Sequence, residues 1–443
     1  MTEKKNFQDF QDLAKRENKS ATAKREMIVF AREHENDDPT RLLLSAARYP
    51  DIDMAAAVQQ IEGRRTAREK WPSLLECEGF IYPPRLNREQ ASSEATALHK
   101  AGLCFLRLDK LRQQGESHSG PVRIADLTGG MGIDTFALAG WKAKEPVEVE
   151  VDYVEQNEEL CRLAQSNAQA LGLKNIHVHC GDSLEWLRQQ DRCFDMIFVD
   201  PARRDKQGRK VAAFDDCTPD ILAHQELLKS KSNEILVKAS PMIDITQGAT
   251  QLRGVGDIYV IAVNGECKEI LFRCGKHITE PAIHCHHLHN GEVDEFVFVR
   301  ENEVQAQATY TSEMKKYLYE PNAALMKAGP FKLLSQKEKV DKLARNTNLY
   351  TSDSFIQHFP GRIFSVVAEI KPSRKDVQQW ITDGKAHVVT RNYPVAAAEL
   401  QKQLGLKEGG DLFVIATTIG SRKSGFVCCL PKNYQHFLQE INK

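Results

Sequence analysis

The stretch from residue 122 to 139, VRIADLTGGMGIDTFALA, constrains the fold of this chain more than any other. It begins as an apolar run, breaks at Thr128, Gly129 and Gly130, and resumes after Gly132 with apolar residues at helical spacing. Glycine lets the backbone turn sharply and lie close to a ligand, and a helix that begins after such a turn points free N–H groups into the same space. The stretch therefore predicts a strand, a tight turn and a helix, with a nucleotide-type ligand site at the carboxyl end of the strand.

Three kinds of glycine-rich loop compete for this stretch. A phosphate-binding P-loop requires GxxxxGK[ST], and no lysine follows these glycines, which excludes it. A dinucleotide fingerprint requires a third small residue where this chain has Thr135, so its fit is partial. An acid at the strand end followed by a glycine-rich turn resembles the loop of class I S-adenosylmethionine (SAM) methyltransferases, and Asp126, Gly130 and Gly132 match that pattern. A glycine-rich turn without any ligand remains open at this point.

Acidic residues also mark the ends of three later strands. The predicted strands end at Glu155, just before Asp182 and just before Asp200, with helical segments between them. Since the carboxyl ends of parallel strands share one edge of a sheet, these acids are expected in one crevice, where Glu155 would accept hydrogen bonds from ribose hydroxyls. We predict that the loop and the strand ends bind the cofactor through Asp126, Thr128, Gly129, Gly130, Met131, Gly132, Asp134, Glu155, Gln156, Asp182 and Ser183.

The pattern of breaks predicts three parts. Residues 1–85 are expected to form a helical domain, 86–310 the core, and 311–443 an α+β domain with a mainly antiparallel sheet. The end of the core, 274–310, is expected either to belong to it or to form a small β-rich module. Helices are predicted at 6–16, 22–33, 53–68, 87–108, 323–327 and 331–343, with residues 317–322 opening the fifth of them.

The net charge of −1 is unevenly distributed along the chain. Residues 331–443 contain 17 Lys and Arg against 10 Asp and Glu, which is compatible with binding nucleic acid and equally with a solvated basic face. The 11 cysteines are scattered without a CxxC, and no apolar run approaches membrane-spanning length. We therefore expect a cytoplasmic protein with unpaired thiols.

A run of cations follows Asp200 directly. It begins with Arg203 and Arg204, and a further lysine, Lys238, is predicted near the end of the fifth strand. We expect these three side chains to bind substrate, with the two arginines holding phosphates. A cluster of surface salt bridges is the alternative for the arginines.

The segment 283–289, IHCHHLH, has the composition of a metal site. Ligands of tetrahedral zinc usually come as two pairs separated by a long loop, whereas alternate residues of a strand point to opposite faces. We therefore predict no metal here, although the sequence leaves open whether the histidines bind one.

Several motifs taken together resemble one family. DLTGGMGIDTFALA, FVDPARRD, KASPMID and YLYEPNAALMKAG with LARNTNLYTSD are similar to bacterial class I SAM methyltransferases that carry a THUMP-like carboxyl-terminal domain. The resemblance covers nearly all of the chain. It implies an α/β fold with a Rossmann-like, seven-stranded core, an N-terminal helical region and a C-terminal α+β domain. It also implies SAM as the cofactor and RNA, either tRNA or rRNA, as the substrate and partner.

The residues after the fourth strand bear on the reaction. Methyltransferases that act on exocyclic amines typically have [DN]PP[YFW] here, whereas this chain has Asp200 and Pro201 followed by Ala202 and Arg203. The DPAR form looks like that of the RNA uridine C5 methyltransferases, which need a cysteine nucleophile; Cys217 lacks a matching context and is not assigned. Asp200 is predicted to orient the substrate or act as general base, with Pro201 beside it. An NAD-dependent oxidoreductase and a non-catalytic protein that binds SAM and RNA remain as alternatives.

Overall fold

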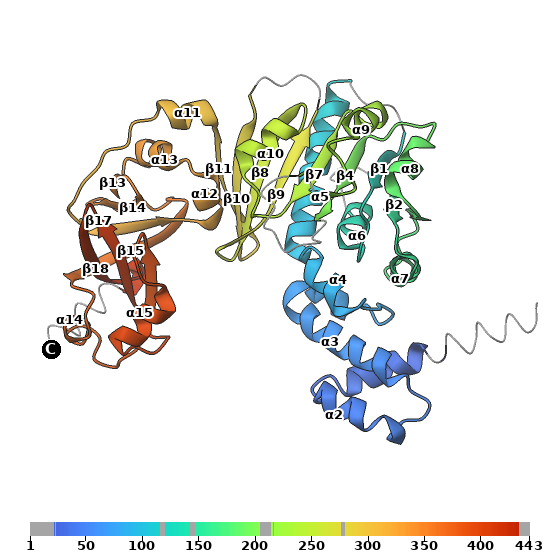
Figure 1. Cartoon of the computed structure of the whole chain (residues 1–443), viewed down its shortest axis with the longest axis horizontal. Helices are drawn as coiled ribbons and strands as arrows, with labels where there is room; N and C mark the ends of the chain where they lie inside the picture. The colour runs from blue at the N-terminus through green and yellow to red at the C-terminus, as the bar shows by residue number, and fades with distance from the viewer. Residues whose placement is uncertain are drawn as a thin grey trace, which may run out of the picture. The chain divides into compact units, whose positions relative to one another are not determined.

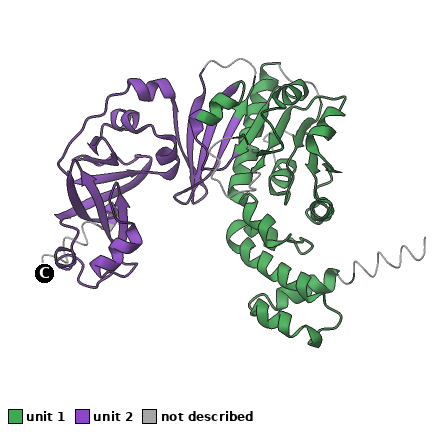
Figure 2. Cartoon of the chain, viewed as in Figure 1, with its two compact units in different colours: residues 1–238, 247–254, 273–276 green, residues 239–246, 255–272, 277–443 purple. Residues whose placement is uncertain are grey.

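The computed structural model describes residues 22, 24–115, 120–141, 147–203, 214–215, 217–275 and 280–433. Two compact units comprise residues 1–238, 247–254 and 273–276, and residues 239–246, 255–272 and 277–443 (Figure 2). Among the described residues, no helix combines the length and apolarity needed to cross a membrane. All eleven cysteines are free thiols.

Short helices form the amino-terminal part of the first unit. A helical stretch covers residues 24–33, followed by α2 (Pro39–Leu44) and α3 (Met54–Lys70). Asp38 and Asp53 cap these two helices by accepting hydrogen bonds from backbone N–H groups, which is the usual role of an aspartate at that position. Phe30, Leu42, Met54 and Ile61 are among the residues that form the core between them. The predicted helix at 6–16 lies outside the described residues.

The helix predicted over residues 87–108 is two helices in the structure. α4 covers Arg85–Gln90, and α5 covers Glu94–Gln113. The break comes at Ser92 and Ser93, because the Ser93 hydroxyl accepts a hydrogen bond from the N–H of Thr96 and so caps α5. The prediction of one helix was wrong because periodicity alone does not reveal a cap inside an apolar pattern.

Five parallel strands form one side of the larger sheet, with β3 at its edge (Figure 1). They are β1 (Val122–Asp126), β2 (Val149–Glu155), β3 (Ile176–Cys180), β4 (Met196–Val199) and β7 (Ile235–Ala239), in the order β7-β4-β1-β2-β3. The helices of this region are α6 (Ile133–Ala139), α7 (Glu158–Ala170), α8 (Ser183–Arg188), α9 (Gln225–Lys231) and α10 (Ile245–Gln251). Parallel pairing brings the carboxyl ends of the five strands to one edge of the sheet.

Four more strands complete this sheet: β8 (Val255–Val263), β9 (Glu266–Cys274), β10 (Ala282–His289) and β11 (Glu292–Val299). The full order is β11-β10-β8-β9-β7-β4-β1-β2-β3. The seven strands from β8 to β3 form the Rossmann-like core that the family resemblance implies, which confirms the fold class. The hairpin β10–β11 extends the sheet because β10 pairs in parallel with β8. The short strands β5 (Ala202–Arg203) and β6 (Cys217–Thr218) pair separately, and α11 (Arg300–Gln305) follows the sheet.

The carboxyl-terminal region has its own seven-stranded sheet, in the order β13-β14-β12-β15-β18-β17-β16. Its elements are β12 (Tyr317–Pro321), α12 (Ala323–Ala328), α13 (Phe331–Glu338), β13 (Asp341–Ala344), β14 (Thr347–Ser352), β15 (Gly361–Ile370), α14 (Arg374–Val377), β16 (His387–Arg391), α15 (Ala397–Leu404), β17 (Leu412–Ile419) and β18 (Arg422–Cys429). All pairings are antiparallel except that of β16 with β17.

Two predicted elements of this region differ in the structure. Residues 317–321 form the strand β12, which is paired on both sides, rather than the opening of a helix. Helix α13 ends at Glu338 instead of running to residue 343, because Lys339 adopts a left-handed conformation with φ 55°. The first difference arises from pairing with strands that are distant in the sequence, and the second from the local conformation of Lys339.

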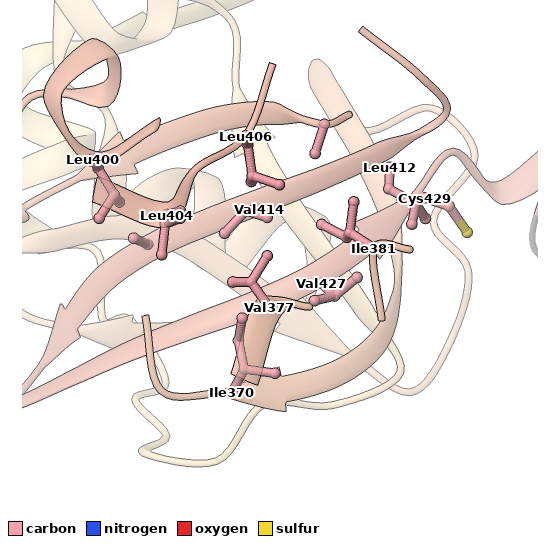
Figure 3. Packing of buried hydrophobic residues seen from close by; sticks show 12 residues of the cluster. Ile370, Val377, Ile381, Leu400, Leu404, Leu406, Leu412, Val414, Val427 and Cys429 are labelled. Atoms are coloured by element: carbon pink, nitrogen blue, oxygen red, sulfur yellow. The ribbon is translucent and has the colours of Figure 1, made fainter. Parts of the chain in front are cut away.

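Apolar side chains of α14, α15 and the loops beside them pack onto the sheet (Figure 3). Leu400 and Leu404 from α15 and Val377 from α14 lie in one cluster with Val414 of β17 and Val427 of β18. All five are at most 2% exposed. Burial of this apolar surface stabilises the carboxyl-terminal sheet and the helices packed on it.

Candidate functional site

The glycine loop between β1 and α6 has the conformation that its sequence predicts. Gly130 and Gly132 have φ values of +53° and +88°, which glycine adopts without steric cost, and Gly132 immediately precedes α6. Gly129 is required for a different reason, because a Cβ there would lie 2.2 Å from the ring of Tyr153. The loop is therefore held closely against β2, and a larger residue at position 129 would displace it.

Asp126 lies beneath this loop. One carboxyl oxygen accepts a hydrogen bond from the N–H of Thr128 at 3.0 Å, and the other accepts one from the hydroxyl of Thr135 at 2.6 Å. Burial raises the pKa of Asp126 to about 7. The structure thus places this residue as an internal support that joins the loop to the first turn of α6.

Glu155 links the end of β2 to the loop. Its Oε2 accepts a hydrogen bond from the N–H of Gly130 at 3.0 Å, and its Oε1 accepts one from the N–H of Asn157 at 2.9 Å. The Tyr153 hydroxyl donates to the carbonyl of Gly130 at 2.7 Å, and burial raises its pKa. The structure therefore brings together the loop and Glu155, as predicted, and adds Tyr153, whose role no local sequence pattern indicated.

The end of β3 contributes a second polar group. The side chain of Gln156 donates to Asp182 at 3.0 Å, and Asp182 also caps α8 through the N–H groups of Leu184 and Glu185. Ser183 is buried at the start of that helix. Gln156 and Asp182 lie in contact, whereas Ser183 is shielded from solvent.

Asp200 follows β4 and faces two neighbouring strands. Its N–H donates to the Thr128 hydroxyl at 2.7 Å, which ties the segment after β4 to the glycine loop. Its carboxylate forms an ion pair with Lys238 at the end of β7. The lysine side chain is 11% exposed and that of Asp200 is 35% exposed, while Pro201 is buried. The predicted catalytic residue and one predicted substrate-binding residue thus lie in direct contact.

Of the two arginines of the predicted substrate site, the structure describes the backbone of one. The backbone of Arg203 lies in β5 opposite Cys217 of β6. Arg204 lies outside the described residues. Cys217 is buried.

A buried polar triad adjoins the loop and includes one predicted residue, Asp134. The Ser92 hydroxyl donates to Asp134 at 2.7 Å, and the Lys100 ammonium lies 3.1 Å from the same carboxylate. Burial of the Asp134 carboxyl acts to raise its pKa, but the ammonium groups of Lys100 and Lys238, together with the hydrogen bond from Ser92, outweigh that effect and lower the pKa. Lys100 is 2% exposed on α5 beside the buried Ala97 and Ala101, and this lysine within an apolar stripe was a signal that the sequence analysis missed.

Ser93 and Glu94, which adjoin this triad in sequence, have structural partners. Ser93 caps α5, and the Glu94 carboxylate accepts a hydrogen bond from the N–H of Ser73 at 3.0 Å.

The polar groups at the strand ends, by contrast, converge from the loop, β2, β4 and β7. Parallel strands with such a glycine loop and such strand ends define a Rossmann-like nucleotide-binding fold, the class to which the class I methyltransferases belong.

Comparisons with known proteins agree with this class. Family models match a methyltransferase domain over residues 118–242, a ferredoxin-like domain over 317–360 and a THUMP domain-like region over 361–430. A protein of Porphyromonas gingivalis W83, whose crystal structure is assigned as that of a methyltransferase, is 30% identical over 93% of this chain and 98% of its own, with a TM-score of 0.77. The chain belongs to this methyltransferase family with a THUMP domain-like region.

A curated relative matches a shorter part. An uncharacterized RNA methyltransferase of Thermosynechococcus vestitus is 32% identical over 105 residues, which are 24% of this chain and 22% of the relative. The matched stretch is therefore less than a quarter of that protein's length.

Proposed function

We propose that this protein transfers a methyl group from SAM to a base of RNA. The observation that carries the proposal is the contact between Glu155 and the N–H of Gly130, because it joins the acid of the second strand and the glycine loop into one site. Methyltransferase family membership supports methyl transfer rather than the hydride transfer of an oxidoreductase.

The residues of the site fit SAM. Each carboxylate oxygen of Glu155 accepts one backbone hydrogen bond and has a second lone pair that can accept from a ribose hydroxyl. A Cβ at Gly130 would meet nothing closer than the Thr128 carbonyl at 3.8 Å, so the backbone is open to a ligand at this point. Asp182, after the end of β3, would contact the adenine, with Gln156 after β2 donating a hydrogen bond to it.

Asp200 is proposed to orient the acceptor base. When bound, SAM would supply an electrophilic methyl group on a sulfonium, with a neutral thioether as the leaving group. Lys238 holds one oxygen of Asp200, and the N–H of Asp200 is fixed by Thr128, so the other oxygen can accept a hydrogen bond from a base N–H in a set direction. Pro201 limits the freedom of the backbone beside it.

RNA as the acceptor is supported by the THUMP domain-like region and by the name of the T. vestitus relative. The excess of Lys and Arg over Asp and Glu in residues 331–443 adds a long-range attraction for phosphates. Arg203 and Arg204 remain predicted phosphate contacts beside the transfer site.

The proposal is tested by titrating SAM into the purified full chain in a calorimeter, followed by transfer of a radiolabelled methyl group to total cellular RNA. We expect binding and label in RNA. Glu155→Ala should weaken SAM binding by about tenfold or more, because it removes two charge-assisted hydrogen bonds. Glu150→Ala, in the same strand, is the matched control, since Glu150 forms only long ion pairs, with Arg123 at 3.7 Å and Arg192 at 3.9 Å.

The outcomes separate the parts of the proposal. SAM binding with no label in RNA, but with label in protein or a small molecule, would contradict the RNA substrate. Equal affinities of the Glu155→Ala variant and the control would contradict the ribose assignment. Failure of the wild type to bind SAM would contradict the proposal as a whole.

A further inference from the structure

The histidines of β10 form two groups on opposite faces of the strand. His284 and His286 lie on one face and His287 and His289 on the other, and each pair faces an acid from β11. We call His284, His286 and Glu295 the His284 triad, and His287, His289 and Asp294 the His287 triad. In each triad the three ligand atoms lie within 4.8 Å of one another.

The His284 triad has the spacing of a metal site. Glu295 Oε1 lies 3.3 Å from Nδ1 of His284 and 3.0 Å from Nε2 of His286. Ligand atoms about 2.0–2.1 Å from a tetrahedral zinc ion are roughly 3.4 Å apart, so little movement is needed to admit an ion. His286 is 5% exposed, which limits its rotation, while Glu295 is 53% exposed and opens the site to solvent.

A second group orients His284 independently. Its Nε2 lies 3.1 Å from a carboxylate oxygen of Asp257 in β8, and its ring stacks on Tyr259 with centroids 4.7 Å apart. A ligating histidine characteristically donates its remaining N–H to a carboxylate in this way, which sets the tautomer and the ring orientation. Asp257 therefore leaves Nδ1 of His284 as the nitrogen that can bind an ion.

We infer that the His284 triad binds a divalent transition metal ion of the zinc class through Nδ1 of His284, Nε2 of His286 and Oε1 of Glu295, with Asp257 as a positioning residue. Two imidazoles and a carboxylate are ligands suited to zinc, and three protein ligands leave a fourth position for water. The ion joins β10 to β11. This site shares no residue with the proposed SAM site and does not depend on it.

The His287 triad likewise has two histidines and one carboxylate, but the nitrogen of His287 that faces Asp294 is not available as a ligand. Nε2 of His287 accepts a hydrogen bond from the N–H of Gly265 at 3.1 Å. The proton of the neutral ring is then on Nδ1, so the nitrogen that lies 3.6 Å from Asp294 has no lone pair for a metal. The two triads therefore form a matched pair in which only one has the required donors.

The prediction of no metal rested on the histidines alone. That prediction considered that the histidines point to both faces of the strand, and the structure has this arrangement. It did not consider Glu295 and Asp257, which lie on the neighbouring strands β11 and β8. These carboxylates complete a ligand set on one face, so the present inference replaces the earlier prediction.

The test uses the full chain after treatment with a chelator, titrated with ZnCl2 in a calorimeter and with CoCl2 in an absorption spectrometer. We expect one site with nitrogen and oxygen ligands and a higher melting temperature with zinc. Glu295→Gln, at an exposed position, should abolish binding or weaken it at least about tenfold, whereas Asp294→Asn in the His287 triad should have no effect. Asp257→Asn should retain the site but weaken it roughly 10- to 100-fold.

Other results would overturn the inference. One is the absence of zinc and cobalt binding to the wild type. Another is binding that Glu295→Gln leaves unchanged, or a cobalt spectrum with thiolate charge-transfer bands, which would assign the ion to cysteines such as the exposed Cys180 and Cys193. An equal loss of zinc affinity in the Glu295→Gln and Asp294→Asn variants would indicate a nonspecific effect of the substitutions on the hairpin.

Discussion

The glycine loop and the β10–β11 hairpin gather polar groups in different ways. At the loop, backbone N–H groups lie close to the ends of parallel strands. Both carboxyl oxygens of Asp126 accept hydrogen bonds from within the loop and the first turn of α6. On the hairpin, side chains from facing positions of neighbouring strands meet in mid-strand, as with His286 and Glu295. The first arrangement lines up backbone and carboxylate groups from several strand ends, and the second brings three side chains together at one point.

The strand-end acids of the loop region also differ from one another. Asp126, Glu155 and Asp200 are alike in the sequence, but the first is 1% exposed and supports the loop. Glu155 and Asp200 are partly exposed and can accept bonds from a ligand. A carboxylate that supports a loop should affect stability, and one that faces a ligand should affect binding or transfer.

The largest expected effect comes from Asp126→Asn and concerns stability. Because the folded-state pKa is raised to about 7, the native state binds a proton that the unfolded state releases near pH 4, so the wild type loses stability as the pH rises through this window. Over this pH range the wild type should lose on the order of 4 kcal/mol of unfolding free energy relative to the Asp126→Asn variant. Denaturation of both proteins between about pH 4 and pH 8 measures it. A constant difference across this range would contradict the assignment of Asp126 as a buried support.

Asp200→Ala should chiefly affect transfer. We expect the rate of methyl transfer to fall at least about 100-fold, because the variant lacks the group that orients the acceptor or accepts its proton, with SAM affinity changed less than roughly threefold. Single-turnover transfer and calorimetry measure the two quantities. Asp195→Ala is the control, since Asp195 precedes β4 at the other end of the strand and accepts a hydrogen bond from the N–H of Arg123. Full turnover by the Asp200 variant would exclude its catalytic role.

Tyr153→Phe should have a smaller effect. It removes the hydroxyl that donates to Gly130 but keeps the ring that Gly129 contacts. The loss of one neutral hydrogen bond corresponds to about 1 kcal/mol, and we expect SAM binding to weaken roughly three- to tenfold. A decrease beyond about 100-fold would mean that the hydroxyl does more than support the loop.

Metal removal should have the smallest effect on the loop. The proposed SAM site and the His284 triad share no residue, so chelation should change SAM affinity by less than about twofold while lowering the melting temperature. Calorimetry with and without a chelator measures this. A large change in SAM affinity would show that the two regions, distinguished here by their chemistry, are coupled.

The sequence by itself determined the glycine loop, the succession of strand-end acids and the presence of a carboxyl-terminal α+β region with a mainly antiparallel sheet. These features are local: glycine spacing sets the turn, and apolar periodicity sets the strands and helices around it. The motifs also sufficed to indicate the methyltransferase family.

Only the tertiary structure decided which polar side chains meet. Lys100 reaches Asp134 from α5, Lys238 reaches Asp200 from β7, and Glu295 completes the His284 triad from β11. The pairing of β12 likewise converted an expected helix start into a strand. The physical reason is the same in each case: strand pairing and helix packing join segments that are distant along the chain, whereas periodicity and motif spacing report only on neighbours.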